Sequence, residues 1–259
     1  IGDNAGGGTW TTAASNSNVA IGATAMNGAL NGALNNTAVG HDTLKVLTTG
    51  DYNVAVGSGA GVAITGGSDN ILIGVNAGDS MTTTLSTVLI GNNAGTAINH
   101  TDANGTVAIG HEAGKAITSG RFNTAVGYQA LYAEDDGDYN TAIGHQALLS
   151  QTGVSGDVSN TAVGYLAGTL ITTGNSNVAI GGSTLYSNLV GSENTVVGNL
   201  SGYNIIGSYT TAIGSQAARF ASGSYNTFVG RKAGYGGTTS APFSSGGNNV
   251  AIGYEALTG

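Results

Sequence analysis

The sequence predicts an all-β fold, a parallel β-solenoid of about 15 coils with a 17-residue repeat. Three observations predict it. The string Asn-Thr-Ala-Val-Gly and its near copies recur along the whole chain, successive motif glycines are most often 17 residues apart, and the apolar residues of the motif alternate with a period of two. A unit this short cannot form a hairpin domain. Each strand is therefore expected to pair with the equivalent strand of the next coil.

The expected strands follow one another in a fixed order, each ending at a glycine that is preceded by Ile or Val in every copy. These glycines are at positions 2, 22, 40, 57, 74, 91, 110, 127, 144, 164, 181, 198, 214, 230 and 253. Further glycines between the motifs supply the positive φ that tight corners require. The chain is thus expected to be a single repeat domain over residues 1–259, and, because both ends interrupt a repeat, a segment of a longer fibre chain.

The motif has two faces, because side chains alternate across a strand. Its β-branched residues share one face, and its Asn and Ala share the other. We expect the β-branched face in the interior, stacked Asn side chains at the corner, and the Ala face as a small apolar surface against which other chains pack. Two complete copies show the pattern: Asn123, Ala125, Val126 and Gly127, then Asn140, Ala142, Ile143 and Gly144.

One coil holds few large apolar side chains, since aromatic residues make up only 6% of the sequence. A single thin chain would bury little apolar surface for each residue that it orders. We therefore expect an oligomer. On the expected faces, Ala125→Arg should block assembly, whereas Gln129→Arg should be tolerated.

Composition excludes several classes of protein. The 6 basic and 14 acidic residues give a net charge of −8, which disfavours nucleic acid and anionic membranes as partners. The chain has no Cys, so it forms neither disulfides nor thiolate metal sites. With 46 Gly but one Pro and no three-residue period, it is not a collagen. No apolar run is long enough to span a bilayer.

Repeats such as residues 140–148 resemble the head repeats of trimeric autotransporter adhesins and are similar to repeats of phage tail fibres and other bacterial surface fibres. The resemblance covers essentially the whole chain, although the adhesin heads have a shorter unit of about 14 residues. It implies a homotrimeric fibre of left-handed β-rolls, located outside the cell on a cell surface or a virion. The implied partners are two further copies of the chain and a glycan or protein receptor on a host surface, without membrane insertion of this segment.

No catalytic constellation is present, and we expect neither an enzyme nor a cofactor. His41, His111 and His145 each follow a motif glycine but lie coils apart, so outward decoration is expected rather than a metal site. The acidic residues Glu134, Asp135, Asp136 and Asp138 lack the spacing of a calcium loop.

The loops between the strands, where solenoids carry their insertions, are the candidate receptor-contact sites. The favoured alternative is that such a loop folds over a neighbouring coil. The acidic stretch is expected to form a solvated loop, and the longest spacer carries the only Pro together with aromatic residues. The candidate contact residues are Tyr235, Thr238, Pro242, Phe243, Glu134, Asp135 and Asp136.

An alternative function is a monomeric ice-binding or ligand-binding solenoid. Ice binding requires regularly spaced Thr on one outward face. Thr does recur in the motif, but Val or Ile replaces it in about half of the copies. That substitution favours an interior position, so the fibre is the leading hypothesis.

Overall fold

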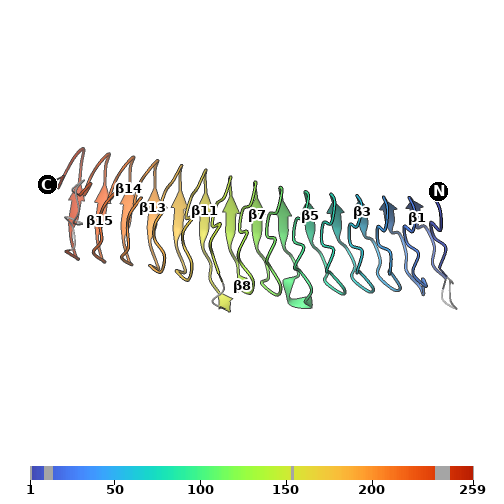
Figure 1. The fold of residues 1–259 in the computed structure, drawn as a ribbon. Helices are drawn as coiled ribbons and strands as arrows, with labels where there is room; N and C mark the ends of the chain where they lie inside the picture. Colours follow the sequence, from blue (N-terminus) through green and yellow to red (C-terminus); the bar gives the residue numbers. More distant parts are fainter. Residues whose placement is uncertain (1, 9–13, 153–154, 237–245, 259) are drawn as a thin grey trace. The chain divides into compact units, whose positions relative to one another are not determined.

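The computed structural model describes residues 2–8, 14–152, 155–236 and 246–258. The chain divides into two compact units, Ile1–Gln129 and Ala130–Gly259. Each unit is a parallel β-solenoid, as Figure 1 shows. The described residues contain no α-helix and one 3₁₀ turn, η1 (Thr101–Ala103). They therefore include no helix that is long and apolar enough to cross a membrane. The predicted all-β parallel solenoid is confirmed.

All strands are short, and those of the repeat span three residues each. The first unit contains β1 (Val19–Ile21), β2 (Thr37–Val39), β3 (Val54–Val56), β4 (Ile71–Ile73), β5 (Val88–Ile90), β6 (Val107–Ile109) and β7 (Thr124–Val126). The second contains β8 (Gly137–Asp138), β9 (Thr141–Ile143), β10 (Gly156–Asp157), β11 (Thr161–Val163), β12 (Val178–Ile180), β13 (Thr195–Val197), β14 (Thr211–Ile213), β15 (Thr227–Val229) and β16 (Val250–Ile252).

Successive strands pair in parallel and match the repeat residue for residue. In the pair β2–β3, for example, Ala38 faces Ala55, with the β-branched residues aligned on either side. Six such pairs in the first unit and six in the second give about twelve turns. The strands β8 and β10 form a separate short pair beside the second set. The 17-residue spacing therefore corresponds to one turn.

The predicted assignment of the two strand faces is wrong. The middle residue of the strand points inward: Ala38, Ala55 and Ala125 are all 0% exposed. The β-branched residues on either side of it are exposed or half-buried. The Ala residues therefore line the core of one chain and offer no packing surface to another.

The opposite wall of each coil explains this orientation. Leu44 and Ile64 are fully buried and come from the segment that follows the strand. A methyl group added at Gly61 would lie 2.7 Å from Leu72 and 2.9 Å from Ile64, so these side chains meet inside the coil. Because large residues already fill this narrow interior, most coils leave room only for Ala in the middle of the strand.

Buried Asn side chains form the ladder predicted at the corner. The Asn36 Oδ1 accepts hydrogen bonds from the backbone and side-chain nitrogens of Asn53, both at 3.0 Å. The Asn53 Oδ1 accepts the same two bonds from Asn70, and the Nδ2 of Asn53 donates to the Gly67 carbonyl at 2.8 Å. In the second unit the ladder runs through Asn160, Asn177 and Asn194. It satisfies polar groups that would otherwise be costly to bury.

The motif glycines occupy a backbone region that L side chains rarely adopt. Gly91 has a φ of 140°, and a methyl group there would lie 2.3 Å from the Gly110 carbonyl oxygen of the next coil. Gly91→Ala is therefore expected to lower the free energy of unfolding by more than about 1 kcal/mol. Chemical denaturation measures this loss. Gly66→Ala is the control, because only the Thr49 and Thr83 side chains lie within 4 Å of the added methyl group. Equal stability of the two variants would contradict the prediction.

Candidate functional site

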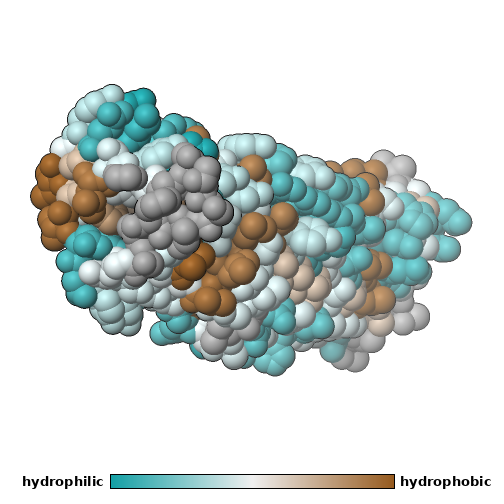
Figure 2. Space-filling view, turned by 60° about the vertical axis from the view of Figure 1, so that its left-hand side comes forward, coloured by the Kyte–Doolittle hydropathy of each residue, from teal (hydrophilic) through white to brown (hydrophobic). Residues whose placement is uncertain are grey.

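The described surface carries a regular face of β-branched residues, which we call the outer face. It consists of the first and third residues of each repeat strand. In β4, Ile71 and Ile73 are 39% and 38% exposed, while Leu72 between them is fully buried. Figure 2 shows hydrophobic residues at the surface among hydrophilic ones.

Within each unit the outer face has two parallel ranks, because the strands pair in register. In the first unit the ranks are Val19, Thr37, Val54, Ile71, Val88, Val107 and Thr124, then Ile21, Val39, Val56, Ile73, Ile90, Ile109 and Val126. Neighbours in a rank are about 4.8 Å apart, the spacing of paired strands. The first unit therefore presents a mainly aliphatic strip to solvent.

The outer face of the second unit differs in one rank. Its first rank consists of Thr141, Thr161, Val178, Thr195, Thr211, Thr227 and Val250. Its second rank is again aliphatic: Ile143, Val163, Ile180, Val197, Ile213, Val229 and Ile252. Five of the seven residues of the first rank are thus Thr, and their hydroxyl groups form a row, interrupted at Val178, beside a row of Val and Ile.

The residues that follow the motif glycines point outward, as predicted. His41, His111 and His145 are exposed. His111 stacks on Tyr128 of the next coil with ring centroids 5.3 Å apart. The rings of His145 and Tyr165 have the same centroid distance of 5.3 Å but are tilted by 33°.

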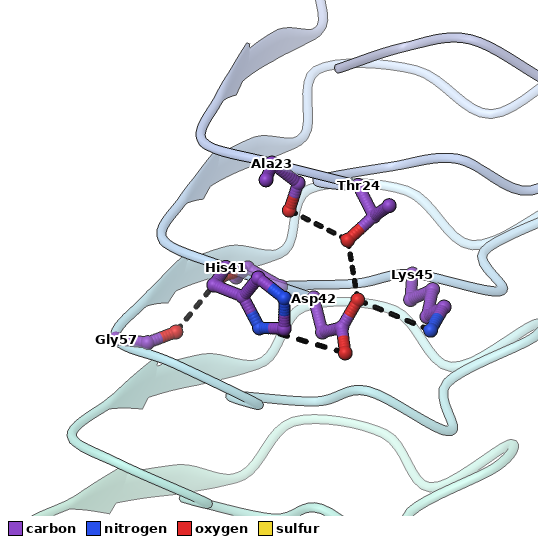
Figure 3. A network of polar contacts seen from close by, with 7 residues as sticks. Ala23, Thr24, His41, Asp42, Lys45 and Gly57 are labelled. Atoms are coloured by element: carbon purple, nitrogen blue, oxygen red, sulfur yellow. Dashed lines mark hydrogen bonds and ion pairs between the residues drawn. The ribbon is translucent and has the colours of Figure 1, made fainter. Parts of the chain in front are cut away.

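Figure 3 shows how His41 is held at the surface of the first unit. Its Nδ1 lies 3.5 Å from Asp42, which also pairs with Lys45 at 3.1 Å and accepts a hydrogen bond from Thr24 of the preceding coil. The hydrogen bond from Thr24, followed by that from Lys45, lowers the pKa of the Asp42 carboxyl. This arrangement links two coils, and His41 contacts it through Asp42.

The acidic stretch is not the fully solvated loop that the sequence predicts. Asp135 is exposed and Asp136 half-buried, but Glu134 is 0% exposed and Asp138 only 3% exposed. Glu134 comes seven residues after a motif glycine, a position that faces the core in other coils. The register of the repeat could have revealed this burial. Of the candidate contact residues here, only Asp135 and Asp136 are accessible.

Burial of Glu134 leads to a pH prediction. Burial, followed by the charges of Asp135 and Asp136, raises the pKa of Glu134 above its usual value of 4.5. The folded chain therefore keeps this proton at pH values where the unfolded chain has lost it. With free divalent cations removed by a chelator, the free energy of unfolding should fall as the pH rises from about 4.5 through the pKa of Glu134 in the folded chain. Urea unfolding between pH 4 and 7 measures this for the original chain and for Glu134→Gln. The substitution should remove much of the pH dependence of the free energy of unfolding. If the free energies of unfolding of the two proteins differed by a constant amount across this pH range, the prediction would be wrong.

The other candidate contact residues lie near the end of the second unit. Tyr235 is half-buried and meets Phe220 edge to face, with centroids 5.4 Å apart. Thr238, Pro242 and Phe243 lie outside the described residues.

Two pairs of stacked tyrosines escaped the sequence analysis. Tyr186 lies on Tyr203 and Tyr209 on Tyr225, with ring centroids 4.9 and 4.8 Å apart. Their spacings of 17 and 16 residues are the signal that could have found them. Their ring faces are turned toward one another along the stack.

Comparison with protein-family models, with curated proteins and with solved structures finds no match to this chain.

Proposed function

We propose that the chain is a rigid segment of an extracellular homotrimeric fibre, on a bacterial surface or a virion. The observation that supports this proposal is the outer face, in which every repeat strand leaves two β-branched side chains in contact with water. Covering such a face removes apolar area from water, at about 25 cal/mol per Å². An exposed apolar surface of this regularity is typical of an interface.

Two further copies of the chain are the proposed cover. A straight rank of Val and Ile fits the same rank of an identical chain, because both have the same spacing along the solenoid. The number three comes from the resemblance of the repeats to trimeric fibres. The trimer is thus proposed to pack through Val and Ile, and the Ala face has no part in it.

The proposed role is mechanical and involves no catalysis. A trimer presents every exposed loop three times, so weak contacts with a host glycan or protein receptor would add through multivalency. Asp135 and Asp136 in the second unit are accessible for such contacts. Their threefold display is the proposed basis of adhesion.

The native mass tests the proposal directly. The chain has a mass of 25.3 kDa, so light scattering should give about three times this value at micromolar concentration. A stable monomer in dilute solution would contradict the fibre.

A second candidate function, ice binding by a monomer, is favoured by the Thr rank of the second unit. The sequence analysis discounted this alternative because Val and Ile replace Thr in many copies, which favoured an interior position. That reason no longer holds, since the position is on the outer face. Thermal hysteresis from a monomer would support ice binding, whereas a trimer without hysteresis would support the fibre. The fibre remains the leading proposal because the other rank, and most of the first unit, is aliphatic.

A further inference from the structure

Glu134 lies at a core position of the repeat where most coils have an apolar residue. Seven residues after the motif glycine, most other coils bury an apolar residue, namely Leu47, Ile64, Met81, Ile98, Ile117, Ile171 and Ile205, and two coils bury an uncharged amide, Gln151 and Asn188. The carboxyl group of Glu134 therefore lies in a position that other coils give to uncharged side chains. A carboxylate there is costly unless something compensates its charge.

The chain compensates only one of the two carboxylate oxygens. The Oε1 of Glu134 accepts backbone hydrogen bonds from Asp135 at 3.0 Å and from Gly137 at 2.7 Å. The Oε2 is buried and has no hydrogen-bond partner among the described residues. Such a carboxyl group is neutralised either by its own proton or by a bound cation.

Two more carboxylates lie at the same place. Oxygens of Glu134, Asp135 and Asp136 all lie within 4.8 Å of one another. Calcium binds carboxylate oxygens at about 2.3–2.6 Å, so two of its ligand oxygens can be up to about 5 Å apart. Magnesium, at about 2.0–2.1 Å, requires a tighter set. The three oxygens therefore fit within one calcium coordination sphere.

The accessibility of the three residues suits an ion at the surface of the coil. Glu134 is fully buried, whereas Asp136 is half-buried and Asp135 exposed, so the site is open to solvent on one side. Water can supply the remaining ligands from that side, as is usual for calcium.

We propose that Glu134, Asp135 and Asp136 bind a calcium ion that stabilises the second unit. The ion would neutralise the buried carboxylate and fix the loop before β9. Burial also raises the pKa of Asp136, followed by the charge of Asp135, which is the electrostatic condition that a bound cation relieves. The ion site requires no second copy of the chain, because every ligand residue belongs to one chain, although Asp135 and Asp136 are also the proposed receptor contacts.

Calorimetric titration of the full chain with CaCl₂, combined with thermal unfolding in CaCl₂ or EGTA, tests the site. We expect saturable binding of one calcium ion per chain and a melting temperature that rises with calcium concentration. Magnesium at the same concentration should give a smaller rise. No heat of binding together with an unchanged melting temperature would overturn the proposal.

Variants separate the site from non-specific binding to an acidic protein. Glu134→Gln and Asp136→Asn should each weaken calcium binding at least tenfold. Asp69→Asn is the matched control, because this exposed acid lies outside the cluster, and it should bind calcium like the original chain. Equal affinity of all three variants would overturn the proposal.

Glu134→Ile keeps the test decisive if Glu134→Gln fails to fold. It restores the residue type of Ile117 and Ile171 at the same position. The variant should melt at a higher temperature than the original chain in EGTA and should show no further rise with calcium. A calcium response that persists in Glu134→Ile would overturn the site.

Discussion

The double variant Ile71→Lys with Ile73→Lys is expected to be a folded monomer under conditions in which the original chain is a trimer. Both side chains belong to the outer face and point away from the core of their own coil, so the solenoid can accommodate lysines there. In the proposed trimer the same positions are covered, and three copies bring six ammonium groups together. Burying an unpaired charge costs several kcal/mol, which is enough to abolish assembly at micromolar concentration.

The matched control is Val75→Lys with Leu85→Lys. These residues are 45% and 39% exposed and lie in the same repeat period, but they are outside the strands and the outer face. The control adds the same charge and removes comparable apolar surface, and it should remain trimeric. Light scattering measures both masses, and circular dichroism checks that both variants are folded. An unchanged mass for the outer-face variant, or an equal loss for the control, would contradict the proposed interface.

Ala125→Arg is expected to unfold the coil that contains it. The side chain is fully buried inside one chain, so an arginine there has no room and no partner for its charge. The loss in the free energy of unfolding should exceed about 4 kcal/mol, a size reached only when the core is disrupted. Chemical denaturation and hydrogen exchange around β7 measure it.

Gln129→Arg is the control for this variant. Gln129 is half-buried and donates to the Glu112 carboxylate at 2.9 Å, an acceptor that an arginine can also use. Its stability should stay close to that of the original chain. If Ala125→Arg lost only its oligomeric mass and kept its unfolding free energy, the inward orientation of Ala125 would be wrong.

Period and register could be predicted from the sequence, because they depend on spacing alone. A fixed distance of 17 residues brings equivalent strands together, and Asn at one offset predicts the ladder that Asn36, Asn53 and Asn70 form. Neither inference requires knowledge of what lies inside the coil.

The inward face could not be derived from the alternation, because a period of two separates two faces without saying which is buried. The preference of Val and Ile for interiors led to the wrong choice. The exceptions at the Ala position carried the missing signal, since they are all apolar, as Leu72 and Phe228 are, whereas the neighbouring rank alternates with Thr. The outer face, and with it the proposed interface, followed only from the structure.

The buried carboxylate of Glu134 could have been found from the repeat register but not from a search for calcium motifs. Its ligand set combines neighbouring residues, and what distinguishes it is a core position seven residues after Gly127. The accessible part of the acidic stretch is therefore smaller than the sequence indicated.

The Asn ladder has a consequence for how such chains change in evolution. Most rungs bond to an identical residue one turn away, so a gene duplication or deletion of one whole period between such rungs recreates the same contacts at the new junction. The length of the solenoid can then change by one period at a time without compensating mutations. A change that is not a whole period breaks this correspondence and must be absorbed by a loop, as in the 20-residue interval between Gly144 and Gly164.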